Sequence, residues 1–454
     1  MSAATALIVY VVLLMAIPSY VTIGPLGSLG RPSLLWGLLL LFWWLLSRLQ
    51  LRSYDARPVP QPVRYAFGAF AVVVLVSFAA AMLRGQPADQ ISPATTALVR
   101  TASWGGVLLV AMDGIRTHSD ASRLARCLAI AGGTLAALGL AQFITGQTLL
   151  DWIGSIPGLA VDSSSVATRG AFTRASGTAI HPLEYGTAVV ASLPLAITAA
   201  VTGGFRTTRS RWAGWWWLPV VLIVAASLIA VSRSAIIGLG VALVASLPAV
   251  PKAYRLAIGI GGGILAIVVL ALVPGMLGTI VSLFAGASDD PSTQSRTNGL
   301  ARVPDFVGSS PLVGQGFGMF LPRYYIFDNA WVLLVVEVGI LGSLSFAAIA
   351  LSAIGSALSA SRRSPFADTK AMAKAIAASM LTVCVIFLFF DGLSFPISAG
   401  LFFLVAGLAA AIRTVAAADV VVVAGTRRAG RAKEKDAPAR NTRPLPAKVR
   451  EESG

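Results

Sequence analysis

Three arginines and two carboxylates stand out in this apolar sequence as side chains that could act on a substrate. Arg174 comes just before the apolar run that starts near Tyr185, Arg233 lies in a short break between two apolar runs, and Arg296 opens the polar half of the segment 275–328. Asp328 and Glu337 lie at the start of another run and just inside it. Guanidinium groups bind the oxygens of a phosphate or diphosphate in pairs, and a carboxylate can accept the proton of an attacking hydroxyl. Gathered on one face of the protein, these residues would suit a lipid diphosphate donor and a hydroxyl acceptor.

Plainer roles are also open for these residues. Asp328 could cap the helix that follows it, and Glu337 could neutralise a buried arginine. Arg233 could be a turn residue whose side chain reaches the membrane surface. His181 could be an ordinary loop histidine or a proton acceptor. Two further outward arginines share this ambiguity between surface charge and substrate contact: Arg169 and Arg302.

Signatures of soluble enzymes do not occur in the sequence, which has no P-loop, no His-Glu-x-x-His and no Cys-x-x-Cys. ATP hydrolysis and structural zinc therefore lack support, and we expect no cofactor and no metal. The glycine-rich GQGFG at 314–318 has no strand and helix around it, so it predicts a turn-rich loop. Cys127 and Cys384 fall in or beside apolar runs and predict no disulfide.

The composition indicates a membrane protein. Mean hydropathy is +0.80, with 56% hydrophobic and 12% charged residues. A soluble protein of 454 residues would need more charge to cover its surface. Runs of about 20 apolar residues suit helices that cross a bilayer, where the backbone must be hydrogen-bonded internally. We predict an all-α polytopic protein with about twelve spans, at 4–22, 33–47, 64–83, 95–112, 124–145, 185–202, 215–231, 235–250, 255–274, 329–359, 375–390 and 395–415.

Basic residues predict which end of these spans faces the cytoplasm. With the N-terminus inside, most of the 35 basic residues fall on that side, so the positive-inside rule places both termini in the cytoplasm. The net charge of +16 is then a topology signal and needs no nucleic-acid partner. Nine arginines remain for the outer side: Arg31, Arg84, Arg100, Arg169, Arg174, Arg233, Arg296, Arg302 and Arg323.

Two predicted outward loops, 146–184 and 275–328, are longer than a membrane anchor needs. We expect the second to carry a working surface. Both belong to a predicted transmembrane domain of residues 1–425, whose first apolar run lacks a basic leader and is expected to be a retained span. Residues 426–454 are charged and poor in large apolar side chains, which predicts a disordered basic cytoplasmic tail.

The chain resembles the O-antigen ligase and polymerase superfamily of bacterial surface-polysaccharide enzymes over about 170–345. Four segments in order carry the resemblance: TRASGTAIHPLEYG (173–186), VSRSAIIGLGVALV (231–244), SRTNGLARVPDFVGSSPLVGQGFGMF (295–320) and DNAWVLLVVEVGILG (328–342). It implies a GT-C-like, inverting, metal-independent glycosyltransferase of the bacterial cytoplasmic membrane. Such an enzyme uses undecaprenyl-diphosphate-linked glycans at the outer face.

The resemblance also implies roles for single residues. Arg174, Arg233 and, less directly, Arg296 would hold the diphosphate. Pro311–Gly316 matches the Pro-Leu-x-Gly-x-Gly element of the family, and Glu337–Gly339 matches its Glu-x-Gly element. These assignments predict one outward cavity lined by the arginines.

One position departs from the family pattern. The family usually has a His-Asn pair, with histidine as the favoured base, where this chain has Asp328 and Asn329. We take Asp328 as the candidate base and Glu337 as a second catalytic candidate that positions an arginine or the acceptor. His181 is an alternative base if its loop folds toward Asp328.

The leading hypothesis is a membrane glycosyltransferase that ligates or polymerises lipid-linked glycans. Its partners would be a lipid-diphosphate-linked glycan donor, a glycan or lipid-glycan acceptor, and membrane lipids. A transporter or flippase of a lipid-linked glycan would have a similar number of spans, but the sequence shows no clear repeat. A non-catalytic subunit of a polysaccharide-assembly complex is the third possibility, favoured by the missing histidine. The sequence leaves ligase and polymerase equally open.

Overall fold

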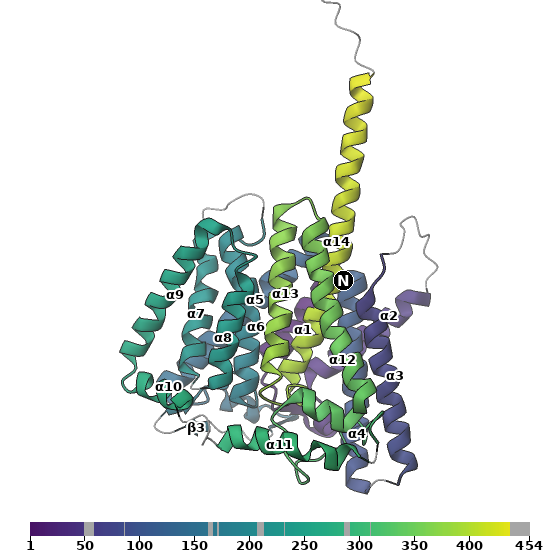
Figure 1. Ribbon diagram of the computed structural model, residues 1–454, viewed down its shortest axis with the longest axis vertical. Coiled ribbons are helices and arrows are strands. Elements are labelled where there is room, and N and C mark those ends of the chain that lie inside the picture. The colour runs from purple at the N-terminus through teal and green to yellow at the C-terminus, as the bar shows by residue number, and fades with distance from the viewer. Residues whose placement is uncertain are drawn as a thin grey trace, which may run out of the picture.

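The structure, a computed structural model, describes residues 1–49, 59–85, 87–161, 167–169, 172–206, 213–230, 232–285, 291–308 and 310–435. They form an antiparallel helical bundle (Figure 1). The helices are α1 (Ala3–Met15), α2 (Pro32–Leu49), α3 (Pro62–Leu83), α4 (Ala88–Gly114), α5 (His118–Thr145), α6 (Pro182–Thr202), α7 (Trp217–Ile229), α8 (Arg233–Ser246), α9 (Lys252–Leu272), α10 (Met276–Ala285), α11 (Pro291–Val307), α12 (Ala330–Arg363), α13 (Ala367–Ile386) and α14 (Pro396–Lys435). Short 3-10 helices cover Gly24–Leu29, Asp151–Ser155 and Ala213–Trp216.

The predicted spans all correspond to helices. Among the described residues, nine helices are long and apolar enough to cross a membrane, and three apolar segments are shorter: Ala3–Met15, Ala213–Ile229 and Arg233–Ser246. This confirms the all-α polytopic fold. The span predicted at 4–22 is shorter than expected, because α1 ends at Met15 and Pro18 follows within three residues.

Local signals in the sequence explain where helices begin and end. Thr117 caps α5 by accepting a hydrogen bond from the Asp120 N–H (3.1 Å), and Gly146 ends that helix in the left-handed conformation. Gly203 ends α6 in the same way. Pro62 and Pro182 occupy first helical positions, where a missing N–H costs nothing.

Small residues allow the central helices to pack closely. A Cβ atom on Gly106 of α4 would lie 2.1 Å from the carbonyl oxygen of Gly37 in α2, so both helices depend on glycine at this crossing. Large aromatic rings fill the space further in, where Phe346 stacks on Phe402 at 4.5 Å between ring centroids. Helix α6 is almost wholly enclosed by the other helices.

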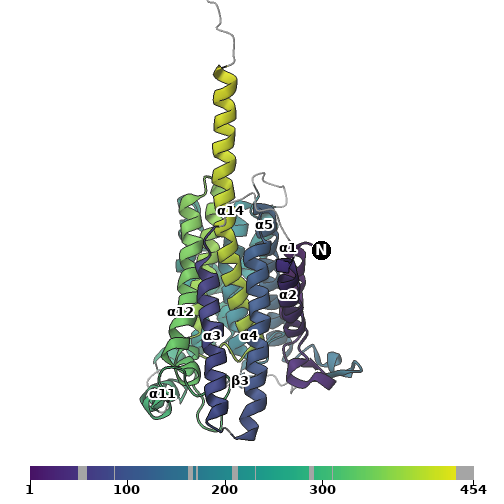
Figure 2. The ribbon, with the colours of Figure 1, turned by 90° about the vertical axis from the view of Figure 1, so that its right-hand side faces the viewer.

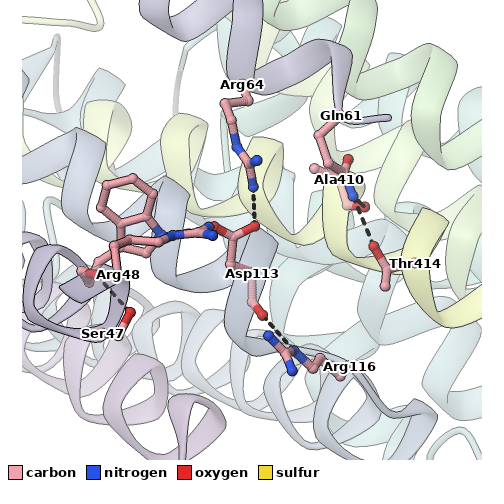
Figure 3. A network of polar contacts seen from close by, with 9 residues as sticks. Ser47, Arg48, Gln61, Arg64, Asp113, Arg116, Ala410 and Thr414 are labelled. Carbon is pink, nitrogen blue, oxygen red and sulfur yellow. Dashed lines mark hydrogen bonds and ion pairs between the residues drawn. The ribbon is translucent and has the colours of Figure 1, made fainter. Parts of the chain in front are cut away.

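The two ends of the bundle differ in character. The C-terminal part of α14 projects beyond the bundle at one end, and the N-terminus lies in the same half (Figures 1 and 2). There Asp113 at the end of α4 forms ion pairs with Arg48 and Arg64, and it accepts a hydrogen bond from Trp44 Nε1 at 2.8 Å (Figure 3). This network ties α2, α3 and α4 together.

The opposite end contains the predicted outward loops, and these include short strands and helices. Strand β1 (Val21–Ile23) pairs antiparallel with β2 (Leu159–Val161), and β3 (Ala167–Arg169) pairs with β4 (Phe172–Arg174). The 275–328 segment contains α10 and α11, and α11 lies across this end of the bundle (Figure 1).

The first ten residues of the predicted disordered tail, 426–454, are helical. Helix α14 continues to Lys435, ten residues beyond 425. The rest of the predicted tail, 436–454, lies outside the described residues.

Candidate active site

Two motifs of the sequence contact each other directly. The backbone of Pro311–Gly316 docks against α12 where that helix breaks at Gly339. The Gly316 N–H donates to the Glu337 carbonyl at 2.8 Å, and the Ile340 N–H donates to the Pro311 carbonyl at 2.9 Å. The break frees these backbone groups from the helix, and the loop supplies their partners. The Pro-Leu-x-Gly-x-Gly and Glu-x-Gly elements are therefore two halves of one joint.

The glycines of this joint are required by space and by conformation. Gly314 has φ of 71° and Gly339 has φ of 66°, in the left-handed region. A Cβ on Gly314 would lie 2.4 Å from the Glu337 carbonyl, and a Cβ on Gly339 would lie 2.4 Å from the Leu312 carbonyl. Neither position can accept a side chain without separating the loop from α12.

The Glu337 carboxylate holds the next turn of the same loop. Its Oε1 accepts a hydrogen bond from the Gly318 N–H at 3.0 Å, and the Phe320 backbone N–H also donates to the carboxylate. The residue is 6% exposed. The turn at 314–318 is the glycine-rich loop that the sequence predicts, with positive φ at Gly314, Gly316 and Gly318. Glu337 therefore positions the loop.

A cavity of about 380 Å³ lies under this loop. One wall is the loop itself, with Phe320, Tyr325 and Phe327. The opposite wall combines α4, the start of α12, and the linker between α13 and α14 (387–395), here called the α13–α14 linker. Its charged and hydroxyl groups include Arg100, Glu337, Asp391 and Ser394. The segment expected to carry a working surface, 275–328, therefore forms one wall of a cavity.

The segment 314–324 is also held by side chains from the end of α3 and the first turn of α4. Arg84 Nη2 donates to the Gly314 carbonyl at 2.8 Å. Arg323 forms an ion pair with Asp89, at the first turn of α4. Gln90 Nε2 donates to the Tyr324 hydroxyl at 2.6 Å. These contacts hold the aromatic wall of the cavity over the first turn of α4.

Arg100 and Asp391 were not singled out in the sequence as site residues. Arg100 in α4 lies close enough to Asp391, Glu337 and Arg31 to interact with them electrostatically. Asp391 accepts a hydrogen bond from the Ser394 hydroxyl. Burial raises the pKa of Asp391, while hydrogen bonds from residues 393–394 and the charge of Arg100 act to lower it. The available signals were an arginine on the outer side and an aspartate that interrupts an apolar run.

Asp328 and Arg296 lie close together beside the α13–α14 linker. Arg296 Nη2 donates to the Phe389 carbonyl at 2.9 Å, and its guanidinium lies 5.8 Å from the centroid of the Phe389 ring. Burial raises the pKa of Asp328 above its usual value, and the positive charge of Arg296 acts to lower it. A carboxyl group with a raised pKa beside a guanidinium has the properties of a general base next to an anion site.

Asn329, the residue after Asp328, caps the N-terminus of α12. Asn329 Oδ1 accepts hydrogen bonds from the Trp331 N–H at 3.0 Å and the Val332 N–H at 3.3 Å. The suggestion that Asp328 caps this helix is therefore wrong, because the cap is Asn329. The Asp328 side chain is therefore not needed to cap the start of α12.

His181 and Arg174 form a second pair near the same linker. The His181 ring lies 5.8 Å from the Phe395 ring centroid, and its Nδ1 accepts a hydrogen bond from the Leu183 N–H at 3.1 Å. Burial, and then the charge of Arg174, lower the pKa of His181 to about 4. At neutral pH the ring is uncharged with its proton on Nε2, so it donates hydrogen bonds and does not suit proton abstraction.

The remaining predicted arginines differ in their placement. Arg233 is the first residue of α8, whose start packs against α6 where Gly186 faces Ala235. Arg302 is exposed on α11, with its guanidinium 5.3 Å from the Tyr325 ring centroid. The backbone of Arg169 lies in β3, and its side chain lies outside the described residues.

The cavity under the loop is not the predicted cavity lined by the arginines. Of the predicted site residues, Glu337 lines the cavity under the loop, while Arg174, Arg233, Arg296 and Asp328 are not among its lining residues. Phe389 of the linker contacts Arg296, and Phe395 contacts His181. The linker therefore contacts both charged pairs and the cavity.

Comparison with known proteins supports the resemblance seen in the sequence. Residues 218–347 match the model of the O-antigen ligase family. No curated protein matches the chain. The matched segment contains Arg233, Arg296, Asp328 and Glu337, and it includes both halves of the joint between the loop and α12. This segment is therefore similar to the O-antigen ligase family, and the chain as a whole has the long apolar helices of a multi-pass membrane protein.

Proposed function

We propose that this protein transfers a glycan from a lipid diphosphate, such as undecaprenyl diphosphate, to a hydroxyl acceptor at the outer face of a bacterial cytoplasmic membrane. The observation that carries the proposal is the proximity of Asp328 to Arg296 at the edge of the long loop. A proton acceptor and an anion-binding group are the two functions that this transfer requires. The O-antigen ligase family match supports the same class of reaction.

The proposed step inverts the anomeric centre. The acceptor oxygen attacks the anomeric carbon, the bond from that carbon to the diphosphate oxygen breaks, and the acceptor proton passes to the Asp328 carboxylate. The lipid diphosphate leaves with the bonding electron pair. Arg296, with Arg174 and Arg233, balances the negative charge that grows on this leaving group. The proton on Asp328 then returns to water.

Glu337 has a different role from the one expected of a catalytic carboxylate. Its Oε1 is engaged by the Gly318 N–H, and the residue is almost fully buried. We assign it to positioning the loop and the cavity wall. The cavity would then accept a sugar unit, since Arg100, Asp391 and Ser394 offer donors and acceptors for its hydroxyl groups.

Reconstitution tests the proposal against its two rivals. Purified protein in liposomes would receive a lipid-diphosphate oligosaccharide and an acceptor glycan, with release of lipid diphosphate and product length both measured. The proposed enzyme releases lipid diphosphate as product appears. A flippase moves the substrate across the bilayer without releasing lipid diphosphate, and a non-catalytic subunit does neither; either of these results would contradict the proposal.

Arg233 provides the first variant for this assay. Arg233→Ala should reduce transfer by about 10²-fold or more, because a positioned charge that stabilises a leaving group contributes on that scale. Membrane insertion and thermal stability should stay near wild type. Arg302→Ala is the matched control, since Arg302 is exposed on α11, and it should retain most of the activity. Full activity of Arg233→Ala would remove Arg233 from the mechanism.

A further inference from the structure

A large apolar groove lies between α1 and α5, lined also by Trp216. Its volume is about 610 Å³, and its walls are mainly aliphatic, with residues such as Val12, Ile130 and Leu138. Val12 and Ile130 are each 51% exposed. The polar Thr134 in this groove turns its hydroxyl to the Ile130 carbonyl at 3.0 Å. The groove is thus an apolar channel on the membrane-facing side of the bundle.

The lengths of the two helices explain why the groove exists. Helix α1 has 13 residues and α5 has 28. At 1.5 Å per residue, α1 covers about 20 Å, less than the roughly 30 Å thickness of the hydrocarbon core. It leaves much of the α5 surface uncovered, along the direction in which lipid chains run.

One end of the groove is strongly basic. Arg123 and Arg126, one turn apart on α5, line it together with the apolar residues. Arg126 lies close enough to Arg206 and Arg123 to interact with their positive charges. The acidic residue one turn before Arg123 is Asp120, whose Oδ2 accepts a hydrogen bond from the Thr117 hydroxyl at 2.8 Å. Three guanidinium groups therefore meet where the groove reaches the membrane surface.

We infer that this groove binds an anionic glycerophospholipid, with its phosphate at Arg123 and Arg126 and an acyl chain along α1 and α5. From Arg123 to Leu138 the wall of α5 is about 22 Å long, which exceeds the half-thickness of roughly 15 Å of a bilayer. An apolar channel that ends at clustered arginines is complementary to an acyl chain that ends at a phosphate. The basic end lies at the start of α5, opposite to the candidate active site. This lipid would therefore occupy the leaflet away from the substrate.

Trp216 makes the inference testable, because it lines the groove at its basic end. Protein in phosphatidylcholine vesicles would be titrated with phosphatidylglycerol or phosphatidylcholine carrying brominated acyl chains, which quench tryptophan on contact. The part of the quenching that disappears in Trp216→Phe reports the groove. We expect the wild type to prefer phosphatidylglycerol by roughly 30-fold, since each arginine near a membrane surface favours anionic lipid by about five- to sixfold.

Charge-matched variants separate the groove from general surface attraction. Arg123→Gln with Arg126→Gln should lose the preference, whereas Arg362→Gln with Arg363→Gln, exposed at the end of α12 on the same side, should keep it. Thr134→Phe should reduce quenching by both lipids because it fills the channel and leaves the arginines intact. Equal quenching by both wild-type titrations would overturn the inference, as would a preference that survives the first double variant or a Thr134→Phe protein that binds like wild type.

Discussion

Asp328 is the residue on which the proposed mechanism depends, and its surroundings predict the pH range in which it would act. Burial raises its pKa and Arg296 counteracts that increase. If Asp328 is the base, only its deprotonated form works, so activity is lost as pH falls through this raised pKa. An ordinary aspartate has a pKa of about 4. The acid limb of the pH profile should therefore lie above that value.

Arg296→Gln should move that acid limb further toward higher pH. Removing the positive charge removes the effect that lowers the pKa of Asp328, and burial then acts alone. The pH profile of kcat/KM measures the shift independently of the overall loss of rate. Arg302→Gln, on the same helix, should leave the limb in place. An unchanged limb in Arg296→Gln would show that another group accepts the proton.

Single residues also show what the sequence could predict of the site. Asp328 and Glu337 lie at the start of an apolar run and inside it, and an ionisable group there points to function. Arg100 and Asp391 carry the same signal, as an outward arginine and a charge between two spans. Their proximity could not be predicted, because α4 and the α13–α14 linker are brought together only by the tertiary fold.

At the scale of elements, the joint between the loop and α12 explains why two distant glycine motifs occur together. Each supplies backbone groups that the other needs, so neither segment is stable in this form alone. The sequence predicted the turn at 314–318 from its glycines. It could not show that this turn docks on a break inside the next helix, since Gly339 lies within a continuous apolar run.

Gly314→Ala and Gly339→Ala should each release the loop. A Cβ at either position meets a carbonyl group at 2.4 Å, and the left-handed conformation adds strain of about 1–3 kcal/mol. We expect faster limited proteolysis within 310–328, a lower Tm and loss of transfer. Gly355→Ala on the same helix is the control, because nothing lies within 4 Å of its added Cβ. Wild-type protease resistance in both loop variants would contradict the joint.

At the scale of the whole molecule, hydropathy predicted the spans well because each needs a long apolar run. It predicted the ends of the spans less well, since these depend on caps and on outer segments such as α11 and the β ribbons. Charge asymmetry predicts that the active-site end faces outward. This orientation in the membrane is a prediction from charge alone and needs its own measurement.

Cysteine labelling measures the orientation. In a background with Cys127 and Cys384 replaced, Ser28→Cys lies in the cavity lining and Ser119→Cys lies at the opposite end, in the first turn of α5. A membrane-impermeant maleimide added to intact cells should label the first and not the second; permeabilised cells should label both. Labelling of the second alone would place the active site in the cytoplasm.

The most direct test of the proposed function exchanges Asp328 in the reconstituted transfer assay. Asp328→Asn keeps the size of the side chain but cannot accept the proton, so release of lipid diphosphate should fall by about 10²–10⁴-fold. Asp328→His introduces the residue that the family usually has and should restore a large part of the rate. Asp305→Asn, exposed on α11, is the control and should match wild type. Near-wild-type transfer by Asp328→Asn would contradict the assignment of Asp328 as the base.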